Sequence, residues 1–265
     1  MKNTALITGA SSGIGFEIAK CLAARGYDLV LTARNEDKLK AAAEVLCESG
    51  RGTVAVVVAD LHNPHAPQDL YNHCVQKGFK INLLVNNAGY AIAGSFDQTP
   101  MEEEEKFIRV LGISVVALSK LFLKDMLEAS EGKIMMISSV AAFAPPSSIQ
   151  ALYGPIKTFV NRFSEALNLN YNHRGITSTA VCPGYTITNF HTASGVQEEM
   201  DRVPSFMKKE ASLVAKEAVE ATLKGKKVCV PSRTFKLIVF LLKVVPHSLF
   251  QLFSQRLAPG RYDCK

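Results

Sequence analysis

Three polar side chains, Ser139, Tyr153 and Lys157, have the types and the spacing to move a proton to or from an oxygen atom. Tyr153 and Lys157 are four residues apart, so in a helix they share one face. A free tyrosine has a pKa near 10, about three units too high for a base at neutral pH, and an adjacent ammonium group favours its phenolate. Tyr153 could then give a proton to a carbonyl oxygen, or take one from an alcohol, while Ser139 hydrogen-bonds the same oxygen. Taken alone, this spacing also arises by chance, so the elements around it decide its meaning.

A glycine-rich segment, residues 8–15, provides a second candidate site. It reads Thr-Gly-Ala-Ser-Ser-Gly-Ile-Gly and lies between an apolar strand and an amphipathic helix. Gly9 permits a tight turn, Gly13 lets the backbone approach a pyrophosphate, and Gly15 lets the helix pack close to the sheet. The segment predicts a dinucleotide site, although its spacing differs from the commoner fingerprint and glycines in such a turn can be structural only.

The end of the second predicted strand indicates which dinucleotide would bind. An acidic residue is expected there for the ribose of NAD, and this chain has Ala33 and Arg34 instead. Arg34 carries a fork of donors that suits a 2′-phosphate, so the pattern favours NADP(H). The alternative is that Arg34 caps a solvated loop before Asn35.

Apolar runs and helical stretches alternate along the chain and must position these groups. The apolar runs lie at residues 4–7, 28–31, 54–58, 81–85, 133–137, 176–181 and 227–230. The stretches with helical spacing lie at 15–25, 36–48, 67–77, 101–128, 152–173 and 212–224. This order predicts an α/β fold in a single domain, a Rossmann-type doubly wound parallel sheet of about seven strands with helices on both faces. Such a fold brings the carboxyl ends of its strands, and the groups that follow them, to one crevice.

In this order the motifs resemble those of the classical short-chain dehydrogenase/reductase family, from Asn3 to about Asn189. The resembling segments are Thr8–Gly15, Asp60-Leu61, Asn86–Gly89, Ser138-Ser139, Tyr153–Lys157, and Pro183-Gly184 with Thr188. The resemblance implies that Tyr153 is the general acid/base, that Lys157 binds the nicotinamide ribose and lowers the pKa of Tyr153, and that Ser139 positions the substrate oxygen.

The same resemblance implies a set of cofactor contacts. Asp60 would contact the adenine, Asn87 the region of the adenine ribose, and Pro183-Gly184 with Thr188 the nicotinamide carboxamide, while Arg34 occupies the NADP-selecting position. The full predicted cofactor set is Gly9, Ser11, Ser12, Gly13, Ile14, Gly15, Arg34, Asp60, Leu61, Asn87, Ala88, Gly89, Tyr153, Lys157, Pro183, Gly184 and Thr188.

Three positions depart from the family pattern. Leu111 stands where the family usually has an asparagine of a proton relay, and Gly112 beside it permits a helix kink, so we expect a weakened or rerouted relay rather than lost activity. The segment from Ser139 to Tyr153 is one residue longer than usual, which reshapes the wall of the substrate pocket. Pro155-Ile156 replaces a pair of small residues, and a proline is tolerated there only in the first turn of a helix.

Residues 189–211 lose clean periodicity, and the resemblance implies a mobile lid over the substrate. Their apolar members favour a lipophilic ligand, because methionine and aromatic side chains adapt to apolar shapes; the alternative is an ordinary packed loop. The relevant residues are Phe190, His191, Val196, Met200, Val203, Pro204, Phe206 and Met207.

The C-terminal part is basic and apolar. The chain has a net charge of +6, and residues 224–265 carry nine basic residues against one acidic residue. Residues 235–257 are rich in Leu, Val and Phe, but Lys243 and Pro246 divide them into pieces too short to span a bilayer. We therefore divide the chain into a domain at 1–232 and an extension at 233–265, of which 233–257 would contact an anionic membrane surface. The alternative is that the extension packs on a second subunit or over the pocket.

Composition and termini indicate the compartment. The six cysteines are far apart and show neither a zinc-binding nor a disulfide-framework spacing, so we expect reduced thiols and no metal. An apolar strand follows the first residues directly and leaves no room for a signal peptide. The expected location is cytoplasmic, with peripheral contact on a cytosol-facing membrane.

These observations favour an NADP(H)-dependent oxidoreductase that transfers a hydride between nicotinamide and a carbonyl or secondary alcohol of a lipophilic substrate, such as a ketosteroid or a 3-oxoacyl compound. The alternative is an NADP(H)-binding regulatory or scaffold protein with weakened catalysis. A nucleic-acid partner is not expected, because the basic tail lacks interleaved stacking aromatics. The resemblance also implies a homodimer or homotetramer through the helices at 101–128 and 152–173.

Overall fold

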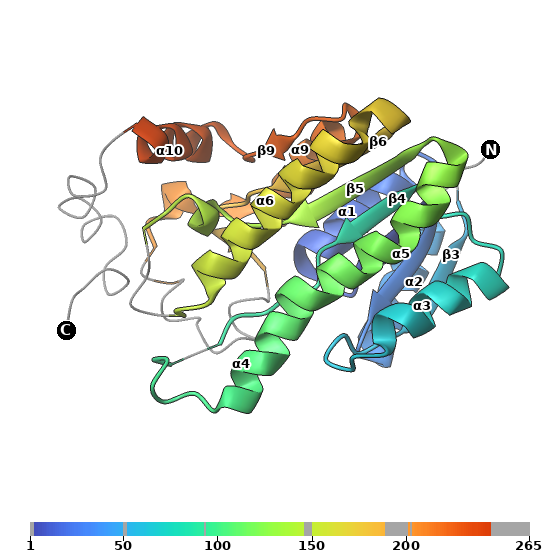
Figure 1. Ribbon diagram of the computed structural model, residues 1–265, viewed down its shortest axis with the longest axis horizontal. Coiled ribbons are helices and arrows are strands. Elements are labelled where there is room, and N and C mark those ends of the chain that lie inside the picture. Colours follow the sequence, from blue (N-terminus) through green and yellow to red (C-terminus); the bar gives the residue numbers. More distant parts are fainter. Residues whose placement is uncertain are drawn as a thin grey trace.

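The structure, a computed structural model, describes residues 3–49, 52–92, 94–145, 150–188, 201 and 203–244. A parallel sheet of seven strands in the order β3-β2-β1-β4-β5-β6-β9 forms its centre (Figure 1). The strands are β1 (Thr4–Thr8), β2 (Asp28–Ala33), β3 (Val54–Val58), β4 (Leu83–Asn86), β5 (Gly132–Ile137), β6 (Ile176–Val181) and β9 (Val228–Cys229). Two short strands, β7 (Thr186–Ile187) and β8 (Lys209–Glu210), pair in a separate parallel sheet. The predicted doubly wound α/β fold is confirmed.

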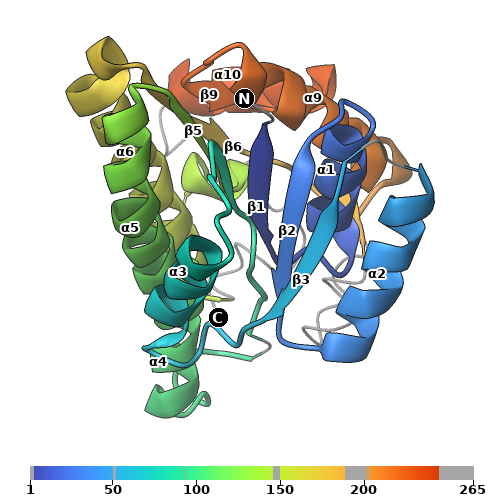
Figure 2. The same ribbon diagram turned by 90° about the vertical axis from the view of Figure 1, so that its right-hand side faces the viewer.

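Helices cover both faces of the central sheet (Figure 2). One face carries α1 (Gly13–Ala23), α2 (Glu36–Ser49) and α9 (Ala211–Leu223), and the other carries α3 (Ala66–Gln76), α4 (Met101–Ile108), α5 (Ser114–Ala129) and α6 (Tyr153–Tyr171). Alternate residues of each strand point to opposite faces. Ile7 of β1 therefore packs against α1 and α9, whereas its neighbour Leu6 packs on the side of α5 and α6.

The chain order reverses between β1 and β4, which pair with each other at the centre of the sheet. In open parallel sheets the crevice at such a reversal, beside the carboxyl ends of the strands, is where ligands bind. The sheet therefore places the loops after β1, β4 and β5 around one opening.

Each predicted strand and helix overlaps one in the structure, but the helix predicted at 101–128 is interrupted. A π-helical segment, Arg109–Ile113, separates α4 from α5. Gly112 weakens the regular helix here, and the Ser114 hydroxyl donates a hydrogen bond to the Val110 carbonyl at 2.6 Å. Such π-segments are frequent at functional sites. Pro155 is the third residue of α6, in the first turn as expected, where its missing N–H leaves no helical hydrogen bond unmade.

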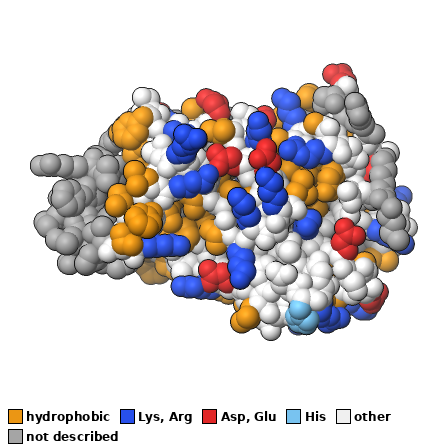
Figure 3. All heavy atoms as spheres, turned by 90° about the horizontal axis from the view of Figure 1, so that it is seen from above, with side chains coloured by type: hydrophobic (Ala, Val, Ile, Leu, Met, Phe, Trp, Pro, Cys, Tyr) orange, Lys and Arg blue, Asp and Glu red, His pale blue; other side chains and the backbone are white. Residues whose placement is uncertain are grey.

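Helix α10 (Arg233–Val244) begins the C-terminal extension and packs onto the domain. Phe235 is buried in a small apolar cluster with Val203 and Met207, here called the α10 cluster, and Val239 of the same helix is also buried. Hydrophobic and basic side chains lie side by side at this end of the molecule (Figure 3). No helix in the described parts of the chain is long and apolar enough to cross a membrane.

Parts of two predicted segments cannot be compared with the structure. Phe190, His191, Val196 and Met200 of the predicted lid, and residues 245–257 of the apolar tail, lie outside the described residues. The described lid residues differ in exposure: Val203 and Met207 are buried, whereas Phe206 is exposed.

Candidate active site

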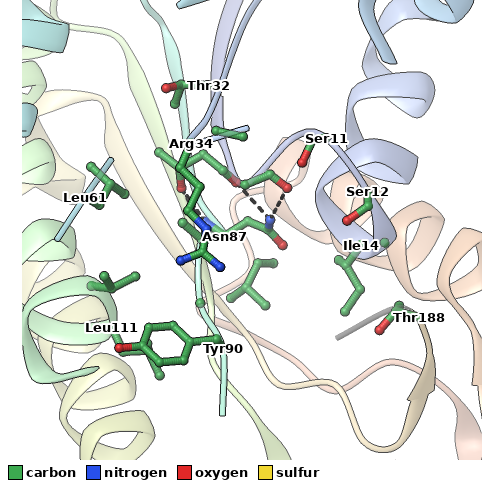
Figure 4. Close-up of a pocket in the computed structure, with 18 of the residues that line it drawn as sticks. Ser11, Ser12, Ile14, Thr32, Arg34, Leu61, Asn87, Tyr90, Leu111 and Thr188 are labelled. Atoms are coloured by element: carbon green, nitrogen blue, oxygen red, sulfur yellow. Dashed lines mark hydrogen bonds between the residues drawn. The ribbon is translucent and has the colours of Figure 1, made fainter. Parts of the chain in front are cut away.

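A cavity of about 480 Å³ opens at the carboxyl ends of β1, β2, β4, β5 and β6, a volume within the usual range for small-molecule sites. With the exception of Gly15, every residue in the predicted site lines it. These are Gly9, Ser11, Ser12, Gly13, Ile14, Arg34, Asp60, Leu61, Asn87, Ala88, Gly89, Ser139, Tyr153, Lys157, Pro183, Gly184 and Thr188. In Figure 4 the glycine-loop residues lie on one side of the cavity and Leu61 and Leu111 on the other.

The glycine loop is held against the end of β4 by a small hydrogen-bond network. The Asn87 side-chain amide donates to the carbonyls of Thr8 (2.8 Å) and Gly9 (3.1 Å), as the dashed lines in Figure 4 show. In return, the Thr8 hydroxyl accepts from the backbone N–H groups of Asn87 (2.9 Å) and Ala88 (3.0 Å). Asn87, predicted only as a cofactor contact, therefore also fixes the shape of the loop.

All three glycines in the loop have conformations or surroundings that disfavour a side chain, and Gly13 has φ +58°. Gly9 has φ +65°, and a β-carbon there would lie 2.9 Å from the Asn87 amide nitrogen. Gly15 does not line the cavity; a β-carbon there would overlap the Gly9 carbonyl and the Asn87 amide. A side chain at Gly15 is thus excluded where the start of α1 meets the glycine loop and Asn87. Helix α1 begins beside the cavity without a side-chain cap or an acidic residue in its first turn, which leaves its positive end for an anion.

Two basic side chains lie where β2 leads into α2. Arg34 and Lys38 are exposed and both line the cavity. Asn35 caps α2, because its side-chain oxygen accepts from the Lys38 backbone N–H at 2.9 Å. Arg34 therefore does not cap this helix. Thr32 also lines the cavity, and its buried hydroxyl has no hydrogen-bond partner among the described residues. Sequence reasoning missed Lys38; a second cation four residues after Arg34 was the available signal.

Asp60, His62 and Tyr90 form a hydrogen-bonded chain at the wall opposite the glycine loop. The Asp60 carboxylate lies 2.8 Å from His62 Nδ1, and His62 Nε2 lies 3.3 Å from the Tyr90 hydroxyl. Burial raises the pKa of the Tyr90 phenol to about 12, so this group stays neutral. His62 and Tyr90 line the cavity but were not predicted, because nothing in their spacing distinguishes them.

Tyr153 and Lys157 lie on the first two turns of α6, which faces the end of β5. Lys157 Nζ donates to the Ile137 carbonyl at 2.8 Å and lies 5.6 Å from the centre of the Tyr153 ring. The Ser138 hydroxyl donates to the Lys157 carbonyl at 2.9 Å and ties the helix to the strand. Lys157 is buried, and this burial lowers the pKa of its ammonium group to about 8.

Ser139 completes this group of side chains from the loop after β5. Its hydroxyl oxygen accepts from the backbone N–H of Ala141 at 3.1 Å, which fixes the side chain. Because the oxygen acts as acceptor here, its O–H proton can be donated elsewhere. Ser139, Tyr153 and Lys157 thus converge on the cavity that Gly184 also lines.

The loop after β6 closes the cavity on the side of α10. The Val140 N–H donates to the Pro183 carbonyl at 2.9 Å and joins this loop to the one after β5. A β-carbon on Gly184 would overlap the Phe235 ring of α10. Thr188 faces the glycine loop, where a β-carbon on Gly13 would lie 3.3 Å from the Thr188 side chain. Gly184 is therefore needed for the close approach of α10, a role that the motif alone did not indicate.

Leu111 lies in the π-helical segment and lines the cavity together with Val110. It is almost completely buried, and its side chain lies near Gly89. The wall where the family's relay asparagine is expected is therefore apolar. No group of His, Cys, Asp and Glu side chains in the described ranges could hold a metal ion.

Comparison of the sequence with known proteins finds a matching family and several relatives. The family model described as short chain dehydrogenase matches residues 3–199. The very-long-chain 3-oxoacyl-CoA reductase of Anas platyrhynchos is 35% identical over 196 residues, which are 72% of this chain and 62% of that protein, under two thirds of its length. The 17-beta-hydroxysteroid dehydrogenase type 3 of Mus musculus is 31% identical over 268 residues, which cover 99% of this chain and 83% of that protein.

A solved structure agrees with these sequence matches. The short-chain dehydrogenase from Sphingobium yanoikuyae in complex with NADPH has a TM-score of 0.83 at 31% identity, and the match covers 94% of each chain. The family match, the parallel sheet and the convergence of motifs on one cavity agree with one another. This chain belongs to the short-chain dehydrogenase/reductase family of oxidoreductases.

Proposed function

We propose that this protein uses NADP(H) to interconvert a carbonyl and a secondary alcohol on a lipophilic substrate. The observation that carries the proposal is that one cavity is lined both by residues suited to a dinucleotide and by residues suited to proton transfer. The glycine loop and Arg34 line one part of it, and Ser139, Tyr153 and Lys157 line another. A binding module alone has no need of the second set.

The residues around the cavity fit a dinucleotide. The uncapped start of α1 and the tight turn at Gly9 suit a pyrophosphate, and the unpartnered hydroxyl of Thr32 offers a polar contact near the ribose end. NADP(H), when bound, supplies or accepts the hydride. The side chains of Asp60, Leu61 and Asn87 would hold the adenosine part, and Gly184 and Thr188 the nicotinamide part.

The protein's own groups handle the proton. During reduction the Tyr153 hydroxyl gives its proton to the carbonyl oxygen, and during oxidation it takes the proton from the alcohol. Ser139 donates a hydrogen bond to the same oxygen, since its own oxygen is occupied by the Ala141 N–H. The Lys157 cation, 5.6 Å from the Tyr153 ring, stabilises the negative charge left on the phenol.

Arg34 and Lys38 support a preference for NADP(H) over NAD(H). We expect Arg34→Ala to raise the KM for NADPH about 10- to 100-fold while the KM for NADH changes little, because only NADPH has a 2′-phosphate to pair with the guanidinium. Steady-state kinetics with both cofactors measure this. Arg162→Ala, which removes an exposed arginine of α6 paired with Glu165, is the control and should change neither value. Equal losses with NADPH and NADH would show that Arg34 does not read the phosphate.

Apolar surroundings support a lipophilic substrate. Val110 and Leu111 line the cavity, and Val203 and Met207 of the predicted lid form buried apolar contacts. Two of the relatives are named for very-long-chain 3-oxoacyl-CoA and for a 17-beta-hydroxysteroid, both substrates with large apolar parts. We therefore propose ketosteroids or 3-oxoacyl compounds as the substrate class.

The proposal is tested by following NADPH oxidation with ketones of increasing apolar size. We expect kcat/KM to rise with the apolar surface of the ketone, because more of it is removed from water in the cavity. NADH is measured in parallel and should give lower values. A rate independent of ketone size would contradict the lipophilic substrate class.

A regulatory or scaffold role is the second candidate, and Leu111 is the observation that favours it. If the apolar side chain at this position blocks proton supply, NADPH would bind tightly without turnover on any ketone. Restored turnover in Leu111→Asn would then assign the block to this residue.

Exposed apolar residues on α6 support the proposal of a homodimer or homotetramer. Phe159 and Leu169 of α6 are exposed, and the Phe159 ring stacks on Phe163 at 6.0 Å. Exposed large apolar side chains along a surface helix are typical of subunit contacts.

A further inference from the structure

Helix α10 has apolar side chains on two opposite faces. Its inner face carries Phe235, which is buried in the α10 cluster, and Val239, which is also buried. Its outer face exposes four large apolar side chains, with exposed fractions of 60% for Leu237, 60% for Phe240, 44% for Leu241 and 58% for Val244. Their spacing of three, four and seven residues from Leu237 places them in one continuous stripe along the helix. A stripe of this kind on a water-facing helix marks an interaction surface.

The charged side chains of α10 are all basic. They are Arg233, Lys236 and Lys243. Lys236 pairs with Glu217 of α9 at 2.9 Å, while Lys243 lies 5.0 Å above the Phe143 ring. Figure 3 shows Lys and Arg side chains beside the hydrophobic side chains at this end of the molecule. The outer stripe is thus bordered by cations and carries no acidic side chain.

We propose that the outer face of α10 docks on an anionic lipid surface and holds the protein there peripherally. Leucine, phenylalanine and valine would enter the acyl boundary, while Lys236 and Lys243 would reach the negatively charged headgroups. A second copy of the chain is a poorer occupant, because symmetric pairing of this face would bring its cations together. The remaining 21 residues of the chain, 245–265, are also basic overall and would meet the same repulsion.

The inner face connects this surface to the cavity. Phe235 covers Gly184, and its ring centre lies 6.4 Å from that of Tyr185, in the loop that closes the cavity. A lipid surface against the outer face would therefore lie one helix away from the proposed nicotinamide end. If the proposed function holds, a lipophilic substrate would then reach the site from the bilayer instead of from water.

The test is sedimentation of the full chain with vesicles, in the absence of NADPH and substrate. We expect binding to equimolar phosphatidylcholine and phosphatidylglycerol, weaker binding to phosphatidylcholine alone, and a decrease with added salt. Phe240→Ser combined with Leu241→Ser should weaken binding at least tenfold, because both side chains would lose their contact with lipid. Val75→Ser, which removes an exposed valine of α3, is the matched control and should bind as wild type.

Each other result would overturn the proposal. Wild type that stays in solution with both vesicle types has no lipid-docking face, and undiminished binding of the double variant would place lipid contact elsewhere in the chain. Sedimentation equilibrium without lipid gives the mass, and a smaller particle for the double variant than for wild type would show that the stripe contacts a second copy. Thermal unfolding confirms that each variant is folded. Because no turnover is measured, failure of the proposed function would not change these results.

Discussion

Tyr153→Phe is expected to lower kcat for ketone reduction about 10³-fold, within the range that positioned acid catalysis contributes, and to leave the KM for NADPH nearly unchanged. The substitution removes only the hydroxyl that would give its proton to the substrate oxygen. The ring remains, and with it the packing against Phe107, whose ring centre lies 6.5 Å away, and the contact with Lys157. The loss should therefore fall on the proton-transfer step rather than on folding or cofactor binding.

The matched control is Tyr71→Phe. The Tyr71 hydroxyl donates to Asp125 at 2.9 Å, and this residue does not line the cavity, so its removal should leave kcat unchanged. Steady-state kinetics and NADPH binding by fluorescence measure both effects. A Tyr153→Phe protein that keeps more than about a tenth of the activity would show that another group supplies the proton. If wild type and Tyr153→Phe bind NADPH with equal affinity and neither reduces a ketone, the result would favour the scaffold role.

Lys157→Met is expected to have two opposite effects, a loss of kcat of about 10²-fold or more and a gain in stability of the unliganded protein. Burial lowers the pKa of Lys157 from 10.5 to about 8, so keeping the ammonium charged in the folded protein costs about 3 kcal/mol near neutral pH. Methionine has a similar shape and no charge, but it leaves the Ile137 carbonyl without its donor at 2.8 Å, which offsets about 1 kcal/mol of the gain. We therefore expect the free energy of unfolding at pH 7 to rise by roughly 1 to 2 kcal/mol.

The pH dependence of this difference checks its cause. Between pH 8 and 10.5 the unfolded lysine binds more protons than the folded one, so the stability of wild type rises with pH relative to the variant. The difference in the free energy of unfolding between Lys157→Met and wild type should be largest below pH 8 and should disappear as the pH approaches 10.5. Urea unfolding across this range measures it, with Lys120→Met, at an exposed lysine of α5, as the control. A gap that is independent of pH, or a variant less stable than wild type at pH 7, would contradict the assignment to the buried charge.

The buried ammonium group of Lys157 thus lowers the stability of the folded protein, and the proposed chemistry gives a reason for its presence. A buried ammonium group with one backbone acceptor is unfavourable in the folded protein, and a purely structural position would select an apolar side chain. Strained or destabilising groups of this kind are concentrated at functional sites.

The sequence by itself determined the features that depend on neighbours along the chain. Apolar runs predicted the strands, the turn residues Gly9 and Gly13 predicted the loop into α1, and the spacing of Tyr153 and Lys157 predicted a shared helix face. Such features follow from backbone geometry and periodicity, which act over a few residues and can be read from a linear pattern. The order of the motifs along the chain then indicated which strand ends meet.

Tertiary structure alone decided the features that join residues far apart in the chain. These include the amide of Asn87 holding the glycine loop, the Ile137 carbonyl fixing Lys157, and the Phe235 ring covering Gly184. Each joins residues that are 20 or more positions apart in the chain, and which atoms meet depends on how the helices pack on the sheet rather than on local spacing. The same holds for His62 and Tyr90, whose place in the cavity wall follows from the packing of the loops after β3 and β4.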